Sequence, residues 1–567
     1  MSVVIGIDLG TSTTEAAVYR DGRKELIPNP DGEMITPSAV GIDDSGNWVV
    51  GERARAQFLV SPERTAIEVK RKTGSGETVQ LGNINCTPVE LQAKLLSYVR
   101  QYASEYLGEN VDHAVISVPA YFNEIQRRET IRSGELAGFT VERILNEPTA
   151  AALTYGLDHM EDESYVLVYD LGGGTFDVTL LEMFDGVLEV KASAGDNQLG
   201  GKDFDELLME HLFKTFQSLY GKNLRNDRQA AARIKEEAEA CKIALSKAER
   251  YRVLIPAICS LNGTPKALDV TVTRGQFEEM SRDLLSRTHE PIDRVLSDAD
   301  IEDGDLDLVI LVGGSTGMPM VARDILDYLG KEAALTVHPD YAVAEGAAIQ
   351  AGMISGEIDP ADGLLMTDVN PYTLGVSARV NGVDDRMSVI IPRNVTIPTT
   401  RTEHYFTSCD YQTEVLVQVY QGESMIASHN NLLGKFSVRD IPPRRAMEEK
   451  IDISFSYDLN GILQVSARLV SNGKEKSIRI DMTDDTKEKE PDPTKWKDAP
   501  DAKKYRAAIR TAERLLQKQD VLSDEERKEL QETLDELKTA LVKENAEAAW
   551  EAGIQLRRLI TAARDEE

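Results

Sequence analysis

The sequence predicts a multidomain protein in which an α/β domain comes first, a β-sandwich second and a short α-helical segment last. Residues 1 to about 360 alternate apolar runs that suit buried strands with helical stretches. From about residue 373 to 482, apolar and polar residues alternate with a period of two, and beyond residue 501 the spacing becomes that of amphipathic helices. With 567 residues, the chain has room for three or four domains.

The composition narrows the classes of protein that the chain can represent. Its formal net charge of −32 argues against nonspecific nucleic-acid binding and against anionic membrane surfaces. The four cysteines lie far apart with no C-x-x-C spacing, so neither a disulfide framework nor a zinc site is indicated. There is no apolar run of transmembrane length and no secretory leader pattern. We therefore expect a cytoplasmic protein with no nucleic-acid or membrane partner.

The α/β domain is organised around a glycine-rich hairpin, VLVYDLGGGTFDVTLL, at residues 166–181. Its first strand ends at Asp170, and the second strand resumes at Thr175 and carries Asp177. The glycines between them, Gly172–Gly174, let backbone N–H groups approach an anion without obstruction by Cβ atoms. The two aspartates suit a hydrated Mg²⁺ ion, which takes few protein carboxylates and keeps most of its waters.

The N-terminal segment repeats this pattern. VVIGIDLGTST, at residues 3–13, has the same order of strand, aspartate, glycine and hydroxyl residues, with Asp8, Gly10, Thr11 and Ser12 at the turn. Either hairpin alone would be an ordinary turn, but a pair of them is typical of two phosphate-binding loops. The repetition predicts an internally duplicated nucleotide-binding domain.

One basic residue, Lys70, and one acidic residue, Glu147, each allow more than one interpretation. By residue type alone, Lys70 belongs to a short run of positive charge that would ordinarily be solvated. Glu147 is an acid of the kind favoured near a helix N-terminus. The glycine loop at residues 195–203 is not a Walker A motif, because neither its spacing nor the residue after its lysine fits.

The second half of the α/β domain adds a polar helix face and another glycine turn. Glu239, Lys242 and Ser246 recur at helical spacing, which is typical of an ordinary exposed face. A buried strand leads into Gly313 and Gly314 and then into a helix, an order that favours a phosphate or ribose contact.

The remaining chain contains a linker candidate, the sandwich and the helices. Residues 362–368, DGLLMTD, could form a buried strand or an interdomain linker. Residues 451–456 and 463–469 alternate apolar and polar side chains on either side of the turn pair Asn460-Gly461. This pattern predicts a hairpin with one face exposed to solvent.

The C-terminal segment follows a polar, proline-bearing connector at residues 486–501. Ser523 and Glu526 form a capping-box pattern. Four leucines then make an apolar stripe that is more typical of a helix–helix core than of a partner site. These leucines are Leu530, Leu534, Leu537 and Leu541.

Ten motifs, in this order along the chain, resemble those of the DnaK-type heat-shock chaperone family: IGIDLGT, VPAYFN, NEPTAAA, DLGGGTFDV, LGGKDFD, VGGST, HPDYAVAEGAA, RNVTIPT, VQVYQGE and DLNGILQVSA. The resemblance covers nearly the whole length. It implies an actin-like ATPase domain at residues 1–361, an interdomain linker at 362–369, a peptide-binding β-sandwich at 370–485 and an α-helical lid at 486–567. It also implies a role in protein folding and the stress response.

The resemblance assigns roles at the nucleotide site. Asp8 and Asp170 would hold the waters of Mg²⁺, with Asp170 also near a K⁺ ion. Lys70 would orient the attacking water and stabilise charge on the γ-phosphate, while Glu147, Thr175 and Asp177 would position water and metal, as phosphoryl transfer requires. The residues that would bind ATP or ADP are Gly10, Thr11, Ser12, Gly172, Gly173, Gly174, Thr175, Glu239, Lys242, Ser246, Gly313 and Gly314.

The resemblance also implies coupling and peptide binding. Pro119 and Arg127 would relay the nucleotide state to the linker. The linker residues that would dock are Leu364, Leu365 and Asp368. The residues that would line a cleft for short extended apolar segments of unfolded client proteins are Val376, Tyr405, Ser408 and Val415. A J-domain co-chaperone would be a partner, with a nucleotide-exchange factor as an optional one.

Several positions depart from the family pattern. Gly317 replaces an arginine that usually covers the adenine, a loss worth roughly 1–2 kcal/mol of ATP binding. Asn197-Gln198 stands where Thr-His is usual, and Arg379 or Val380 stands where an apolar residue would close an arch over the peptide. With the short lid, these departures resemble the specialised HscC branch.

Three functional hypotheses follow. The first is an ATP-dependent chaperone in which hydrolysis traps a client peptide. The second, a small-molecule kinase on the same actin-like fold, is opposed by residues 370–567, which such kinases do not carry. The third is a nucleotide-dependent binding or exchange-factor-like scaffold with little turnover, which Gly317, the altered arch and the short lid keep open.

Overall fold

The computed structural model describes residues 3–157, 159, 163–334, 337–359, 365–471, 475–479, 496, 502–517, 524–542, 549, 552–557 and 559–560. The chain divides into two compact units, Met1–Ile480 and Asp481–Glu567. Within the described residues, no helix combines the length and apolarity needed to cross a membrane.

The α/β part of the first unit is built on two mixed sheets. The first has the order β11-β10-β1-β2-β3. Its strands are β1 (Val4–Leu9), β2 (Thr13–Arg20), β3 (Arg23–Leu26), β10 (His113–Val118) and β11 (Thr140–Asn146). The short strand β4 (Thr36–Pro37) also pairs with β2.

The second sheet has the order β18-β17-β12-β13-β14-β19-β22. Its strands are β12 (Ser164–Leu171), β13 (Phe176–Phe184), β14 (Val187–Asp196), β17 (Leu308–Val312), β18 (Ala333–Ala334), β19 (Leu365–Val369) and β22 (Thr396–Ile397). In both sheets an antiparallel hairpin, β1–β2 or β12–β13, lies beside a parallel strand, β10 or β17. The two predicted hairpins therefore occupy equivalent places in the two sheets.

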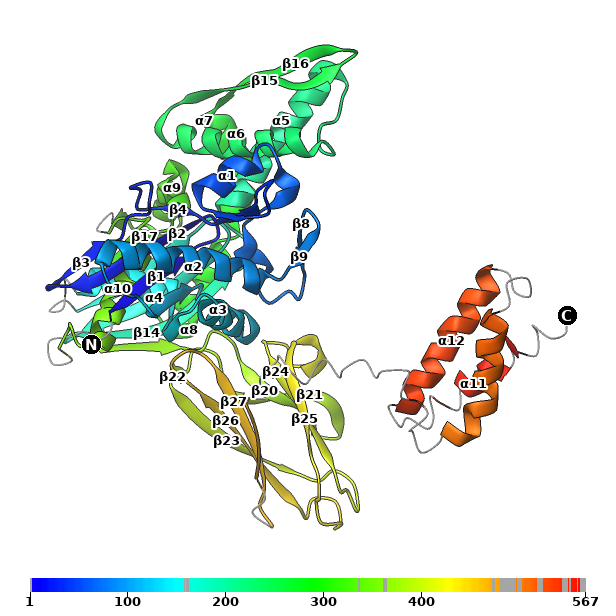
Figure 1. Cartoon of the computed structure of the whole chain (residues 1–567). Coiled ribbons are helices and arrows are strands. Elements are labelled where there is room, and N and C mark those ends of the chain that lie inside the picture. The colour runs from blue at the N-terminus through cyan, green and yellow to red at the C-terminus, as the bar shows by residue number, and fades with distance from the viewer. Residues whose placement is uncertain are drawn as a thin grey trace. The chain divides into compact units, whose positions relative to one another are not determined.

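Helices complete these layers (Figure 1). Two alanine-rich helices, α4 (Glu147–Gly156) and α10 (Ala342–Ser355), share a core with both sheets, in which Val115, Ala151 and Ile310 are fully buried. The helices α2 (Pro88–Leu107) and α3 (Glu124–Leu136) each begin at a capping box, which satisfies backbone N–H groups of their first turn.

A second lobe packs on the second sheet (Figure 1). It consists of α5 (Gly201–Tyr220), α6 (Arg228–Lys247), α7 (Arg274–Ser286), α8 (His289–Ala299), α9 (Pro319–Leu329) and the hairpin β15 (Arg250–Leu261)–β16 (Thr264–Thr273). Its core joins that of the sheet through Phe204, Phe216 and Cys241, which are fully buried.

The first lobe carries smaller elements beside the first sheet. These are β5 (Ala39–Ile42), β6 (Trp48–Val50), α1 (Glu52–Phe58), η1 (Pro62–Arg64), β7 (Thr65–Ile67), η2 (Val69–Lys72), β8 (Val79–Leu81) and β9 (Ile84–Cys86). The element η2 is a single turn of 3₁₀ helix, and it brings Lys70 to the cavity described below.

The sandwich consists of two four-stranded antiparallel sheets, β21-β20-β24-β25 and β23-β26-β27-β28. Its strands are β20 (Leu374–Val380), β21 (Val383–Ile391), β23 (Thr399–Phe406), β24 (Val415–Gln421), β25 (Asn431–Val438), β26 (Lys450–Tyr457), β27 (Leu463–Leu469) and β28 (Glu475–Arg479). The predicted hairpin at Asn460-Gly461 is confirmed, because it joins β26 to β27. Phe455 and Val465 are fully buried between the sheets.

The segment between the α/β part and the sandwich forms a strand, which was one of its two predicted forms. Leu365–Val369 is β19, which pairs parallel with β14 and antiparallel with β22. Leu365 is 63% exposed, and it joins the sheet through its backbone N–H, which donates to the carbonyl of Gly186 at 3.0 Å. Leu364 lies outside the described residues.

The second unit is a small helical core. The helices α11 (Ala502–Gln517) and α12 (Asp524–Val542) pack with a helical segment at residues 552–557. The predicted leucine stripe is a helix–helix core, since Leu530, Leu534, Leu537 and Leu541 are all buried there. The predicted capping box needs Ser523, which lies outside the described residues.

Candidate nucleotide site and its connection to the sandwich

The two glycine hairpins face one cavity of about 410 Å³. The predicted site residues that line it come from both sheets, η2, α4 and α6. They are Asp8, Gly10, Thr11, Ser12, Lys70, Glu147, Asp170, Gly172, Gly173, Thr175, Glu239, Lys242, Ser246, Gly313 and Gly314. Of the residues predicted for this site, Gly174 and Asp177 do not line the cavity itself.

The two hairpin turns approach each other so closely that a side chain would separate them. A Cβ atom on Gly173 would overlap the hydroxyl of Ser12, and one on Gly174 would lie 2.7 Å from the Thr11 side chain. The glycines were predicted because backbone N–H groups must reach an anion. The packing of one turn against the other supplies a second reason for them.

Lys70 is buried, so its interpretation as part of a solvated charge run is wrong. Its Nζ lies 2.5 Å from Oε1 of Glu147, and both side chains are at most 10% exposed. Arg71, the next residue of the run, forms an ion pair of 2.5 Å with Asp203 and donates to the carbonyl of Gly174 at 3.0 Å. The buried pair fixes an ammonium group at the wall of the cavity, where it can face an anion.

Three buried aspartates stand near this pair. Burial and the neighbouring Glu147 carboxylate raise the pKa of Asp8 and of Asp177 to about 7, and burial raises that of Asp170 well above its usual value. Asp8 accepts a hydrogen bond of 2.7 Å from Ser117, and Oδ1 of Asp177 accepts one of 3.0 Å from the backbone N–H of Tyr121.

These carboxylates fit a hydrated cation. Oδ2 of Asp177 is buried and has no hydrogen-bond partner. Among the residues described, no three potential ligands are grouped so as to hold a metal ion directly. Such a donor set matches Mg²⁺, which keeps several waters and binds through one or two carboxylates, and a bound cation would lower the pKa of each of these acids.

The opposite end of the cavity is lined by α6 and the glycine turn after β17. Nζ of Lys242 contacts Asp205 at 2.8 Å and donates to the carbonyl of Gly201 at 3.1 Å, while Glu239 is paired with Arg55 at 2.6 Å. The helix face that residue type alone assigned to solvent therefore lines the cavity. The direction in which a Gly317 side chain would point is open, with no atom within 4 Å.

The structure adds two acids to this cavity that sequence reasoning missed. Glu15 is 2% exposed and stands opposite Asp8 in the register of β1 and β2, and Asp340 lies at another part of the wall. The available signal for Glu15 was an acid directly before the apolar run Ala16–Val18 of β2. Burial, followed by the charge of Asp8, raises its pKa well above the usual range.

A buried network joins the cavity to β19. Oδ2 of Asp368 accepts hydrogen bonds from Asn146 at 2.8 Å and from Thr149 at 3.3 Å. Arg127 is also buried and donates to the side chain of Asn146 at 2.7 Å and to the carbonyl of Ala120 at 3.0 Å. Arg127, a predicted relay residue, and Asp368, a predicted docking residue of the linker, thus share Asn146, which precedes Glu147 in the chain.

Pro119, the other predicted relay residue, opens the turn that Arg127 holds. Its carbonyl accepts from Phe122 at 3.1 Å, and the Phe122 carbonyl in turn accepts from Arg127 at 3.2 Å. Asn146 was missed as a site residue because its two partners are 19 and 222 positions away in the chain.

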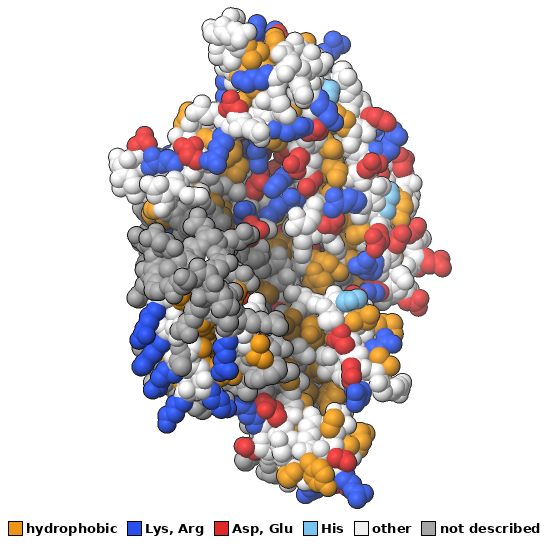
Figure 2. Space-filling model, turned by 90° about the vertical axis from the view of Figure 1, so that its right-hand side faces the viewer, with side chains coloured by type: hydrophobic (Ala, Val, Ile, Leu, Met, Phe, Trp, Pro, Cys, Tyr) orange, Lys and Arg blue, Asp and Glu red, His pale blue; other side chains and the backbone are white. Residues whose placement is uncertain are grey.

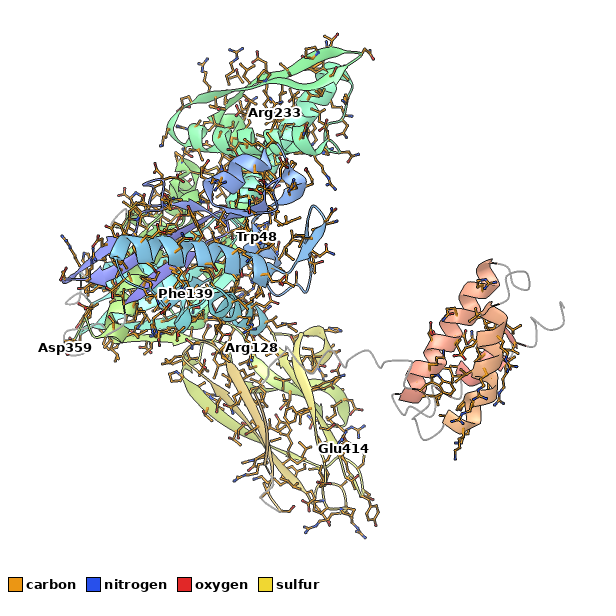
Figure 3. All side chains as sticks on the ribbon, viewed as in Figure 1. Trp48, Arg128, Phe139, Arg233, Asp359 and Glu414 are labelled. Atoms are coloured by element: carbon orange, nitrogen blue, oxygen red, sulfur yellow. The ribbon has the colours of Figure 1, made fainter. Side chains whose placement is uncertain are left out.

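The sandwich also contacts the α/β part directly. Glu124 accepts a 3.0 Å hydrogen bond from the backbone N–H of Leu463, and Arg128, marked in Figure 3, donates to the Leu463 carbonyl at 3.2 Å. On another side, Arg393 and Asn394 both bind Asp298, at 2.6 and 2.7 Å. The described structure is therefore a docked form, in which the sandwich rests on the α/β part.

The predicted peptide-binding residues do not gather in the same way. Val376 is buried in β20, Val415 begins β24, and Ser408 is exposed in a loop. The hydroxyl of Tyr405 donates to Ser388 at 2.9 Å and so links the two sheets. A cavity of about 470 Å³ in the sandwich includes none of these four.

That sandwich cavity has an apolar rim. It is lined by the arch candidate Val380 and by Val383, Val389 and Met425, each at least 43% exposed. Figure 2 shows hydrophobic side chains gathered at the lower end of the face that it presents.

Comparison with known families identifies the chain. The family model described as Hsp70 protein matches residues 4–80 and 76–565. The protein therefore belongs to the Hsp70 family, which confirms the family resemblance inferred from the ten motifs. Members of this family are ATP-dependent chaperones that bind nucleotide with Mg²⁺ and act on unfolded proteins with J-domain co-chaperones. The match does not separate the HscC-like branch from the others, and that branch stays a prediction.

Proposed function

We propose that this protein is an ATPase in which ATP binding and hydrolysis control the capture and release of short apolar segments of unfolded proteins. The observation that carries the proposal is the cavity where both glycine hairpins, the Lys70–Glu147 pair and the buried aspartates converge. The buried network from Asn146 to Asp368 connects that cavity to the sandwich.

The residues of the cavity suit phosphoryl transfer, which depends on positioning and electrostatics. Asp8 and Asp170 would hold Mg²⁺ through water, and a bound Mg²⁺ supplies neutralisation of phosphate charge; Asp170 would also face K⁺. Glu147 holds the ammonium of Lys70 in one position, from which Lys70 would orient the attacking water and stabilise charge on the γ-phosphate. Thr175 would help to place that water.

The coupling is a two-state equilibrium. We infer that ATP favours the docked form, with β19 in the sheet and the sandwich on the α/β part, and that ADP favours an undocked form that holds peptide. Asp368 supports this idea, because its carboxylate is buried against Asn146 and would have to leave that environment on undocking.

The client segments would be short, extended and apolar, because the sandwich exposes apolar side chains and strand backbone. The partners we propose are unfolded polypeptides, a J-domain co-chaperone and a nucleotide-exchange factor, acting in the cytoplasm during stress.

The test is single-turnover ATP hydrolysis by the wild type and Lys70→Ala, with and without a library of short apolar peptides. We expect peptide to raise the wild-type rate and Lys70→Ala to lower it about 10²–10³-fold, the range for removing one preorganised charge-stabilising group. Lys214→Ala is the matched control, since this lysine is 72% exposed on α5. Nucleotide binding without Lys70-dependent turnover or a peptide response would instead support the scaffold hypothesis.

A further inference from the structure

Tyr121 stands where three parts of the molecule meet. Its backbone N–H donates to Oδ1 of Asp177 at 3.0 Å, beside the nucleotide cavity. Its carbonyl accepts two hydrogen bonds, one of 2.8 Å from Asn197, in the loop that leads from β14 to α5 of the second lobe, and one of 2.9 Å from the hydroxyl of Tyr372 at the start of the sandwich. A single peptide segment is thus held by both lobes and by the sandwich.

The contact between the two tyrosines is specific in geometry. The ring centroids of Tyr121 and Tyr372 lie 4.3 Å apart with an interplanar angle of 44°, so the two rings are in close, tilted contact. The hydroxyl of Tyr121 also accepts from Arg294 on α8 at 3.3 Å. This hydrogen bond from Arg294 therefore fixes the position of the ring pair relative to α8.

Tyr372 is in turn tied to the sandwich, so it must move when the sandwich moves. Its carbonyl accepts a 2.8 Å hydrogen bond from Asn370, and the next residue, Thr373, donates from its N–H and its hydroxyl to Glu423 at 2.8 and 2.9 Å. These hydrogen bonds fix the backbone of Tyr372 to the sandwich, so the sandwich sets the position of the Tyr372 hydroxyl.

We propose that Tyr372 is a positioning residue that holds Tyr121, and through its N–H the carboxylate of Asp177, in place while the sandwich is docked. This contact is separate from the network of Asn146 and Asp368. It gives the sandwich a second connection to the cavity, made by one hydroxyl and one ring. The assignment of Asp177 to the hydrolytic site rests on the proposed function. The contacts of Tyr121 and Tyr372 are independent of that function.

Asn197 also holds Tyr121 in place. It occupies one of the positions where this chain departs from the family pattern, and its amide supplies the second hydrogen bond to the Tyr121 carbonyl. The other atom of that amide, Oδ1, is buried without a hydrogen-bond partner, so its orientation is set by the bond to Tyr121.

The test compares Tyr372→Phe, which removes only the hydroxyl, with Tyr372→Leu, which also removes the ring. Tyr106→Phe is the matched control, because its hydroxyl binds Glu25 at 2.5 Å on the surface of α2. The first readout is hydrogen exchange in the full chain with ATP, at the amide of Tyr121 and at the amides of β19. This readout needs no turnover.

We expect Tyr372→Phe to speed exchange at Tyr121 roughly two- to tenfold, the effect of one hydrogen bond, while β19 stays protected. Tyr372→Leu should do so more strongly, and Tyr106→Phe should change neither. Unchanged exchange at Tyr121 in both variants would overturn the proposal. Equal loss of protection at Tyr121 and β19 would also overturn it, since that pattern means general undocking.

The second readout is single-turnover hydrolysis. If the hydrogen bond from Tyr121 keeps Asp177 in a less active position in the docked form, Tyr372→Phe should raise the basal hydrolysis rate roughly two- to tenfold. The stimulation of hydrolysis by peptide should then shrink by the same factor. If the wild-type protein does not hydrolyse ATP, the proposed function is wrong. The hydrogen-exchange rates of the variants would still decide the role of Tyr372.

Discussion

The nucleotide cavity and the sandwich differ in how their predicted residues assemble. In the cavity, residues from Asp8 to Gly314 line one space, and the turns touch so closely that Gly173 has no room for a Cβ atom. In the sandwich, Val376 is buried while Ser408 is exposed, and the cavity that exists lies elsewhere. A compact ligand such as a nucleotide would be held by residues that converge on one cavity, whereas an extended chain would be held by residues distributed along strands and loops.

The largest effect that separates the two regions should come from Gly173→Ala. The added methyl group would overlap the Ser12 hydroxyl, and overpacking of this kind costs typically 1–3 kcal/mol. We expect ATP affinity, measured by titration calorimetry, to fall by about 10- to 100-fold.

The effect should be confined to the cavity. Peptide affinity without nucleotide should not change, and Ser12→Gly in the same chain should restore part of the ATP affinity by making room for the methyl group. If peptide binding falls together with ATP binding, the contrast between the two regions is wrong.

A smaller effect, of opposite sign, should come from Gly317→Arg. No atom lies within 4 Å of the direction of its side chain, so an arginine has space to lie over the base. A cation–π contact of roughly 1–2 kcal/mol would raise ATP affinity by about five- to thirtyfold. Gly304→Arg is the control, because its side chain would also point into open space, away from the cavity. An unchanged affinity would mean that the base does not lie beside residue 317.

A pH-dependent effect concerns the boundary between the regions. Burial raises the pKa of Glu124 from 4.5 to about 7. A carboxyl whose pKa is higher in the folded than in the unfolded state binds more protons when folded, so its contribution to stability is present below pH 4.5 and is lost as the pH rises to about 7.

Glu124→Gln should therefore flatten the fall in unfolding free energy between pH 4.5 and 7, measured by denaturant titration without nucleotide. The glutamine keeps a carbonyl for the Leu463 N–H, so docking should survive. An identical pH dependence in the two proteins would show that Glu124 does not titrate in this range.

Much of this molecule could be predicted because its motifs are local. The two hairpins and the leucine stripe each depend on residues close together in the sequence, and all are found where expected. Residue type alone assigned Lys70 to solvent, since its partner Glu147 is 77 positions away; the family resemblance was needed to place the two in one site.

What could not be predicted depends on distant pairs. Asn146 lies within the NEPTAAA motif, but its contacts with Arg127 and Asp368, like that of Tyr372 with Tyr121, form only when distant segments fold together. The position of Leu365 shows the same limit, because an apolar residue at the start of β19 is satisfied by its backbone pairing and leaves its side chain outside.

The pairing of β19 has a consequence for aggregation. β19 covers β14 only from Val187 to Glu189, so its departure would uncover an edge of about 10 Å at 3.3 Å per residue. An unpaired edge can capture another chain unless it is short or charged. This one carries Glu189, with Lys191 and Glu182 paired beside it. If β19 leaves the sheet as proposed, the edge that it uncovers is therefore short and charged, which disfavours the addition of a strand from another chain.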